Sequence, residues 1–246
     1  GGGLPDLGAQ APMSTLWVYL SASPLLWLCL TLGVYLAALK TQQRCGGTPW
    51  LNPVLLAVLM LVALLQASGT PYERYFEGAQ FVHFLLGTAT VALAVPLRRH
   101  WAQLRPQLGA AALGLLVGNG LGALLAVLLV RVAGAPAVVQ ASVAPRGVTA
   151  PVAMALAERI GGLPSLTAVL VIGSGILGAT LASPWLNALG VRDPAARGLA
   201  IGCAAHGIGT ARAFQEQALT GTFAGAAMAA SALISSLWVP WMMRWL

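Results

Sequence analysis

Long apolar runs separated by short polar stretches dominate this sequence, and their lengths predict membrane-spanning helices. A helix that crosses a bilayer needs about 20 predominantly apolar residues, and it tolerates proline and glycine. Three segments depart from this pattern, because 53–67 is short while 136–158 and 195–219 are interrupted or weakly apolar. In all, the chain has about eight hydrophobic segments, at 16–39, 53–67, 79–97, 108–131, 136–158, 164–189, 195–219 and 221–243.

Basic residues near the ends of these segments set the expected orientation, since cytoplasmic loops of membrane proteins are enriched in Lys and Arg. The basic groups at 40–44 and 98–105 are separated by two crossings and are predicted to share the cytoplasmic side. Beyond residue 136 two alternatives are open. If 136–158 crosses the membrane once, Arg159 lies inside and Arg192 outside, whereas a re-entrant segment reverses both positions.

Composition supports a membrane protein and excludes two other classes. Apolar residues make up 58% of the chain and charged residues 8%, against roughly 45–50% and about 25% in soluble domains. A soluble enzyme and a disordered chain are therefore both excluded. The net charge of +7 comes from 13 basic and 6 acidic residues scattered among apolar blocks, which favours loop charge over nucleic-acid binding. The three cysteines form no CxxC motif, so no disulfide framework, metal site or cofactor is predicted.

We expect residues 13–246 to form a single domain, an all-α polytopic membrane protein. Residues 1–12 are rich in Gly and Pro and are excluded from the fold as a flexible tail or cloning remnant. Residues 70–78 are expected to form a charged loop. The tripeptide Gly-Thr-Ala at 87–89 recurs at 209–211, and because transporters are often built from repeated halves, an inverted repeat with discontinuous helices is predicted.

The segment 144–154 carries the strongest candidate for an anion site. Pro145 and Pro151 each lack a backbone donor, so the helix is predicted to unwind between them and to restart near Pro151. Arg146 and the positive N-terminal end of the restarted helix suit a carboxylate, and Thr149 adds a hydroxyl. Irregular backbone survives at membrane depth only where it is buried in protein or lines a wet cavity. The alternative is a short surface loop with a solvated Arg146.

A second candidate lies in the segment 198–212. Gly198, Gly202, His206 and Thr210 are spaced four apart, so they share one helix face on which small residues end in an imidazole and a hydroxyl. This face can present hydrogen bonds to a small polar solute. The alternative is a packed helix whose His206 bonds a neighbouring carbonyl. Arg212 favours function, because ionisable residues inside membranes are costly, but a simple ion pair with Glu216 remains open.

The glycine-rich spans suggest helix packing. Gly114, Gly118 and Gly122 lie on one face of the span 108–131, and this spacing favours close contact with a neighbouring helix. Gly221 and Gly225 repeat the spacing in the last span, with the same interpretation.

Two further features concern polar residues within spans. Asn119 lies beside the glycines of 108–131 and is expected to make an interhelical hydrogen bond. In the segment 85–97, Gly87, Thr88 and Thr90 are candidates for a bend that lines a path, or else the hydroxyls bond their own helix.

Several motifs resemble the LrgB/CidB family of bacterial membrane proteins. The similar runs are LNP at 51–53, GTATVALAVPL at 87–97, PRGVTAPVAMALAERIGG at 145–162, GILGA at 175–179 and ARGLAIGCAAHGIGTARAF at 196–214. The H-x-x-G-T-A-R string at 206–212 is the most specific of these features. Gly147 and Ala150 depart from the family pattern by lacking hydroxyls, and Thr88 stands where many relatives carry proline.

The resemblance implies one of two functions in the bacterial inner membrane. Some members are holin/antiholin-like modulators of murein hydrolase activity and autolysis that act with a small LrgA/CidA-like partner. Others are similar to carriers of pyruvate, and a chloroplast-envelope relative exchanges glycolate and glycerate. An intramembrane Ser174–His206 protease is disfavoured, because Ile172 stands where such a motif needs glycine, and the protein is not predicted to be an enzyme.

The leading hypothesis is a secondary transporter of small monocarboxylates, 2-oxo or 2-hydroxy acids, which works by alternating access. Arg146 would pair with the carboxylate, and His206 would donate to the substrate or carry a coupled proton. A coupled proton or cation and a homodimer are consistent with this hypothesis. The predicted binding residues are Thr88, Thr90, Arg146, Gly147, Thr149, His206, Gly209, Thr210 and Arg212.

Overall fold

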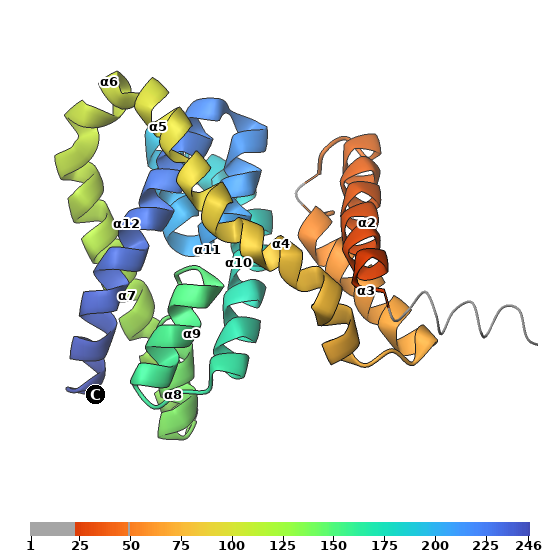
Figure 1. Cartoon of the computed structure of the whole chain (residues 1–246). Coiled ribbons are helices and arrows are strands. Elements are labelled where there is room, and N and C mark those ends of the chain that lie inside the picture. The colour runs from red at the N-terminus through yellow and green to blue at the C-terminus, as the bar shows by residue number, and fades with distance from the viewer. Residues whose placement is uncertain (1–22, 49) are drawn as a thin grey trace, which may run out of the picture. The chain divides into compact units, whose positions relative to one another are not determined.

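The computed structural model describes residues 23–48 and 50–246, and its regular secondary structure there is entirely helical (Figure 1). The predicted tail 1–12 and the start of the predicted span 16–39 lie outside these residues. The helices are α2 (Pro24–Arg44), α3 (Pro53–Ser68), α4 (Tyr72–Ala92), α5 (Ala94–Arg99), α6 (Trp101–Leu104), the 3-10 turn η1 (Arg105–Gln107), α7 (Leu108–Val132), α8 (Ala137–Val143), α9 (Ala150–Arg159), α10 (Pro164–Ala188), α11 (Pro194–Glu216) and α12 (Ala218–Met243).

The all-α polytopic fold is confirmed. Among the described residues, five helical stretches are long and apolar enough to cross a membrane: Pro24–Arg44, Tyr72–Arg99, Trp101–Val132, Pro164–Ala188 and Ala218–Met243. As predicted, α3 is too short for a full crossing at typical bilayer thickness. The chain divides into two compact units. The first comprises the described residues up to Thr48 together with Pro53–Ala89, and the second comprises residues 50–52 together with Thr90–Leu246. A single domain over 13–246 stays a prediction.

The predicted loop at 70–78 is wrong, because α4 already begins at Tyr72. An aromatic stripe explains the early start. Tyr72 stacks on Phe76 with ring centroids 5.7 Å apart, and Tyr75 meets Trp27 of α2 edge-on at 6.0 Å. Aromatic residues at this helical spacing stabilise a first turn in spite of its charges. The predicted bend at 87–90 also shifts, because α4 runs on to Ala92 and the break falls at Leu93.

Helices α8 and α9 form a hairpin, residues 137–159, which we call hairpin A. In an unbroken helix Ser142 and Gly162 would lie about 30 Å apart. Instead, a Cβ on Gly162 would lie 2.8 Å from the Ser142 nitrogen. The Leu163 amide also donates to the Ser142 hydroxyl at 2.8 Å, and the Thr167 hydroxyl to the Ser142 carbonyl at 2.9 Å. The chain therefore enters and leaves this segment on the same side, as the re-entrant alternative requires.

Helix α11 is a second hairpin, residues 194–216, which we call hairpin B. Its backbone leaves helical geometry at His206, where φ is 39° and ψ is −130°. In a straight helix Arg197 and Glu216 would lie about 28 Å apart, yet their side chains form an ion pair at 3.1 Å. Ala213 and Ile201 also share one core cluster. The two arms of α11 therefore run antiparallel on either side of His206.

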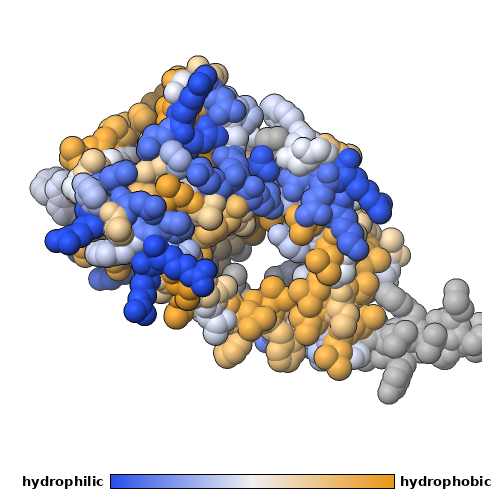
Figure 2. Space-filling view, turned by 90° about the horizontal axis from the view of Figure 1, so that it is seen from above, coloured by the Kyte–Doolittle hydropathy of each residue, from blue (hydrophilic) through white to orange (hydrophobic). Residues whose placement is uncertain are grey.

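These reversals fix the path of the described second unit, in which α7, α10 and α12 cross and the two hairpins enter from opposite sides. Leu104, just before α7, packs in one cluster with Ala195 at the start of hairpin B and with Phe223 of α12. The start of α7 and the base of hairpin B thus lie on one side. Figure 2 looks down on the α5–α6 end and shows hydrophilic side chains gathered there above hydrophobic flanks.

The two Gly-Thr-Ala tripeptides on which the predicted inverted repeat rests have different structural surroundings. Gly87, Thr88 and Ala89 belong to the regular part of α4, whereas Gly209, Thr210 and Ala211 follow the reversal at His206. The similarity of the two tripeptides therefore does not support the repeat by itself, and the repeat stays a prediction.

The path of the chain through the second unit predicts which loops lie on the same face of the membrane. Single cysteines that replace Arg105 and Arg192, in a chain whose native cysteines are changed to serine, should react on the same face with a membrane-impermeant maleimide. A cysteine at Gly134, beyond the other end of α7, should react only on the opposite face. Labelling of positions 105 and 192 on opposite faces would mean that residues 136–158 cross the membrane.

Candidate functional site

The predicted break between Pro145 and Pro151 is present as the tip of hairpin A. Helix α8 ends at Val143 and α9 begins at Ala150, with Pro151 in its first turn. Thr149 stands at the N-cap with extended backbone, but its hydroxyl does not bond the helix end. Within the tip, the Val148 amide donates to the Pro145 carbonyl at 3.3 Å. The break therefore has the predicted position, and its backbone forms a hydrogen-bonded turn.

His206 forms the tip of hairpin B, and its ring points at α10. Its Nε2 lies 3.0 Å from the Val171 carbonyl oxygen, and the side chain is buried. The Thr210 hydroxyl donates to the His206 carbonyl at 2.7 Å and so bonds a peptide group next to the break. His206 therefore has the contacts of the packed alternative, although the helix itself is broken there.

Both tips rest on the same short stretch of α10. The Ser174 hydroxyl lies 3.3 Å from the Arg146 carbonyl and 3.0 Å from the Val171 carbonyl, which is the oxygen that His206 also contacts. A Cβ on Gly175 would lie 2.6 Å from the His206 ring, so only glycine leaves room for it. Ser174 lies about 15 Å along α10 from its first residue and about 21 Å from its last. The tips therefore meet near the middle of a spanning helix.

A cavity of about 510 Å³ lies beside the tip of hairpin A. Ala144, Arg146 and Gly147 line it from the tip, and the remaining lining comes from α7, α12 and the first arm of hairpin B. Among the described residues, the two ion pairs of the chain involve other arginines, so no carboxylate pairs with Arg146. The cavity is therefore lined, near the middle of the second unit, by an arginine that has no carboxylate partner among the described residues.

The glycine stripe of α7 lines this cavity, which corrects the predicted helix packing. A Cβ on Gly114 or Gly122 would meet nothing within 4 Å, and one on Gly118 would lie 3.3 Å from the Cys203 sulfur. The stripe leaves space in place of a close helix contact. In α12 the packing prediction is confirmed, because Gly221 lies against the Phe214 ring and Gly225 lies near Leu93.

Asn119 joins α7 to α12, as predicted, and also lines the cavity. Its amide nitrogen donates to the Leu115 carbonyl at 2.8 Å and to the Ser231 hydroxyl at 3.0 Å, while Ser235 donates to its amide oxygen at 3.4 Å. Asn119 and Ser235 are cavity residues that the binding-site prediction missed. The signal for Asn119 was present, because it is a lone amide within an apolar span.

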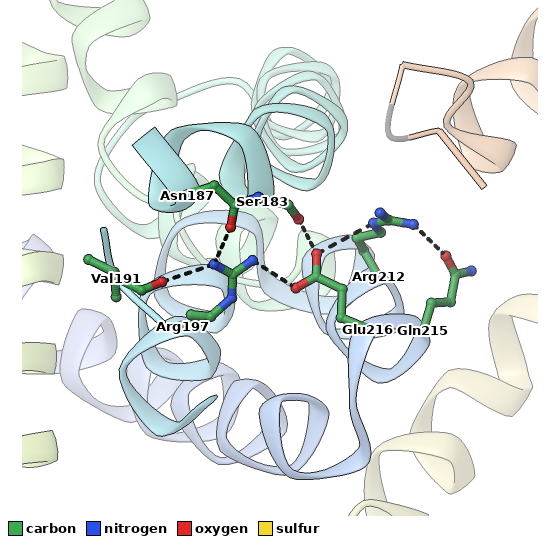
Figure 3. Close-up of polar contacts among 7 residues, drawn as sticks. All are labelled: Ser183, Asn187, Val191, Arg197, Arg212, Gln215 and Glu216. Carbon is green, nitrogen blue, oxygen red and sulfur yellow. Dashed lines mark hydrogen bonds and ion pairs between the residues drawn. The ribbon is translucent and has the colours of Figure 1, made fainter. Parts of the chain in front are cut away.

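Arg212 belongs to a polar cluster at the base of hairpin B (Figure 3). Its Nε lies 3.7 Å from the Glu216 carboxylate, which also pairs with Arg197 at 3.1 Å and accepts a hydrogen bond from Ser183. Arg197 further donates to Asn187 at 2.8 Å. The predicted Arg212–Glu216 pair is thus present, and Arg197, which sequence reasoning missed, fastens the base of the hairpin to the end of α10.

The remaining predicted binding residues have structural contacts. Gly209 is required by the reversal, because a Cβ there would lie 2.9 Å from the Ile201 side chain. In the first unit, the Thr88 hydroxyl donates to the Leu85 carbonyl at 2.9 Å, which is the helix-internal bond of the alternative interpretation. The Thr90 carbonyl accepts from the Leu93 amide at 3.2 Å, next to the break of α4.

The contact between Gly175 and His206 gives a stability prediction. Gly175→Ala should lower the free energy of unfolding by about 1–3 kcal/mol, because the new methyl group overpacks the imidazole. Gly173→Ala on the same helix is the control, since a Cβ there meets nothing within 4 Å, and it should leave stability unchanged or raise it. Thermal unfolding in detergent measures both, and equal midpoints would show that the His206 ring does not rest on Gly175.

Comparison with known proteins agrees with these features. The model of the LrgB-like family matches residues 31–245. YxaC of Bacillus subtilis is 33% identical over 217 residues, covering 87% of this chain and 92% of the relative. YwbG of the same organism is 32% identical over 219 residues, covering 89% and 97%. The Holin-like protein CidB of Staphylococcus epidermidis is 30% identical over 222 residues, covering 90% and 96%. No solved structure matches.

This relationship confirms the resemblance seen in the motifs and suggests a protein without enzymatic activity. Among the described residues, Ser174 and His206 both contact the Val171 carbonyl, and no hydrogen bond joins them as a catalytic pair requires. The match spans all three crossing helices and both hairpins of the second unit. The chain therefore belongs to the LrgB-like family of multi-pass bacterial membrane proteins.

Proposed function

We propose that the second unit binds a small monocarboxylate at Arg146 and carries it across the membrane. The observation that supports this most is an arginine at a helix break that lines a cavity and has no carboxylate partner among the described residues. An uncompensated charge at membrane depth is costly. A carboxylate offsets this cost, because it pairs with a guanidinium through two parallel hydrogen bonds.

The lining of the cavity supplies a route to this charge. Ala111 and Ala196 lie near the beginnings of α7 and hairpin B, on the side where Leu104 packs against Ala195. Arg146 and Asn119 lie deeper, near the middle of the second unit. An acid would therefore enter from the side that carries Arg105 and Arg192, which the excess of basic residues assigns to the cytoplasm.

Two rows of small residues face this route and suggest how it closes. Ala196, Ala200 and Ala204 form an exposed row on the first arm of hairpin B, and the glycine stripe of α7 lines the same cavity. Small residues let helices approach closely. Movement of the alanine row onto the glycine stripe closes the cavity, so that hairpin B acts as a gate in alternating access. Coupling to a proton or cation, and a homodimer as scaffold, are further parts of the carrier proposal.

A holin-like role is the second candidate function, and the names of the relatives support it more directly than they support carriage. Two Staphylococcus species contain relatives named Holin-like protein CidB, at 30% identity. In this role the chain would modulate murein hydrolases and autolysis together with a small LrgA/CidA-like membrane partner. Its expected signature is poorly selective, non-saturable leakage, whereas a carrier saturates.

The carrier proposal predicts saturable uptake that depends on Arg146. Proteoliposomes containing the purified protein should take up labelled pyruvate or glycolate, with and without a proton gradient as the test of coupling. Arg146→Gln should lower uptake at least about tenfold, because it removes a charge-assisted bond, and Arg146→Lys should retain part of it. Arg159→Gln, at an exposed position on α9, is the control with expected wild-type uptake.

Two results would contradict this prediction in different ways. Full uptake by the Arg146→Gln variant would remove the proposed site while leaving transport intact. Release of an entrapped neutral dye, without saturation and without dependence on Arg146, would favour the holin-like role.

The proposed gate predicts a cross-link that the present arrangement does not favour. A Cβ on Gly114 meets nothing within 4 Å, so Gly114→Cys and Ala200→Cys should form a disulfide under oxidation only when hairpin B closes, and this should stop uptake. Gly118→Cys with the native Cys203 is the positive control, and Leu113→Cys with Ala200→Cys is the negative control. Cross-linking of the 118–203 pair alone would mean that the gate does not close in this way.

A further inference from the structure

The cavity separates hydrogen-bond donors from acceptors. On the hairpin A side it offers the Arg146 guanidinium, which has donors only. The other polar side chains that line the cavity are Asn119 of α7, Ser235 of α12 and the Cys203 thiol of hairpin B. Both Asn119 and Ser235 are at least nine-tenths buried. The hydrogen-bond donors and acceptors that remain free on these two side chains determine which acids the cavity can bind.

Both amide hydrogens of Asn119 are already used. One points to the Leu115 carbonyl at 2.8 Å and the other to the Ser231 hydroxyl at 3.0 Å. Because the Leu115 carbonyl can only accept, the amide nitrogen must face it, and this fixes the orientation of the side chain. The amide oxygen therefore remains as the group that Asn119 can offer to the cavity.

The Ser235 hydroxyl has likewise used its only hydrogen-bond donor. Its hydroxyl hydrogen is directed at the Asn119 amide oxygen, at an oxygen–oxygen distance of 3.4 Å. A hydroxyl whose hydrogen is used keeps its lone pairs as acceptors. These two side chains thus present oxygen acceptors to a ligand.

We propose that Asn119 and Ser235 determine specificity, by selecting monocarboxylates that carry a hydroxyl group over oxo and unsubstituted acids. The carboxylate binds Arg146, and the ligand hydroxyl donates to the Asn119 amide oxygen or to the Ser235 oxygen. This inference rests on the proposed function, whose site it extends by a second contact.

The discrimination follows from donor and acceptor balance. An oxo group has lone pairs only, so against these two oxygens it gains no hydrogen bond and repels them. An unsubstituted acid leaves both oxygens as they are in the empty cavity. A site built to hydrogen-bond a substrate hydroxyl rejects analogues that lack it more strongly than an apolar pocket does, because buried polar groups are left unpaired.

Three acids of equal carbon number test the inference. Binding of lactate, pyruvate and propionate to the purified, full-length protein is measured by competition against one labelled acid. Lactate should bind about two- to tenfold more tightly than pyruvate or propionate, the ratio expected for one net hydrogen bond. Ser235→Ala should reduce this ratio, and Asn119→Leu combined with Ser235→Ala should abolish it.

Ser236→Ala is the matched control, because the Ser236 hydroxyl donates to the Ala232 carbonyl at 2.7 Å and Ser236 does not line this cavity. Unchanged propionate binding in each variant shows that the cavity is intact. The single Ser235→Ala variant keeps the test decisive where the double variant does not fold.

The outcomes separate this inference from the proposed function. If all three acids bind equally and binding depends on Arg146, or if pyruvate binds most tightly, selection by Asn119 and Ser235 is overturned while the carrier proposal stands. If none of the acids binds in a manner that depends on Arg146, both the carrier proposal and this inference fail.

Discussion

The second unit depends on one constraint, which is that peptide groups freed by a chain reversal inside a membrane must find partners within the protein. Two reversals occur at depth, at 144–149 and at His206, and both are fastened to Val171–Gly175 of α10. Ser174 bonds the carbonyl of one tip, and the imidazole of the other tip contacts Val171. At the opposite end of hairpin B, Glu216 joins the two arms through Arg197. Helix α10 therefore acts as the fixed element on which both hairpins are positioned.

Small residues serve two opposite purposes around this frame. Gly198 and Gly202 bring hairpin B into backbone contact with α12, near Thr220 and Ala224, where a side chain has no room. Gly114 and Gly122 of α7 belong to a stripe with the same spacing but face open space. Spacing alone cannot distinguish these cases, because both need small residues on one helix face. Only the position of the neighbouring helix decides whether a glycine stripe closes a gap or keeps one open.

The sequence predicts those features that have a local cause. Pro145 and Pro151 locate the first break because proline removes a backbone donor, and the order of the spans follows from hydropathy. The second break lacks such a signal, since His206 takes a positive φ that its side chain does not favour and that Val171 and Gly175 stabilise from another helix. For the same reason the helix face predicted to run from Gly198 through His206 to Thr210 does not persist through the break. Arg146 was predictable as a cavity residue, whereas Arg197 and Ser235 depend on tertiary contacts.

The basic residues of the second unit differ in how their charge is compensated, and this difference supports the proposed site at Arg146. Arg197 and Arg212 share Glu216, and Arg131 at the end of α7 donates to the Leu246 carbonyl at 2.7 Å. Arg146 lies near the middle of the membrane-spanning layer. There its positive charge can be compensated only by whatever occupies the cavity. A charge in this place needs water or an anion, and both need a wide path through the apolar layer. Gly114 and Gly122 of α7 leave open space of this kind, so in the proposed function the space that would let water reach Arg146 would also admit a carboxylate.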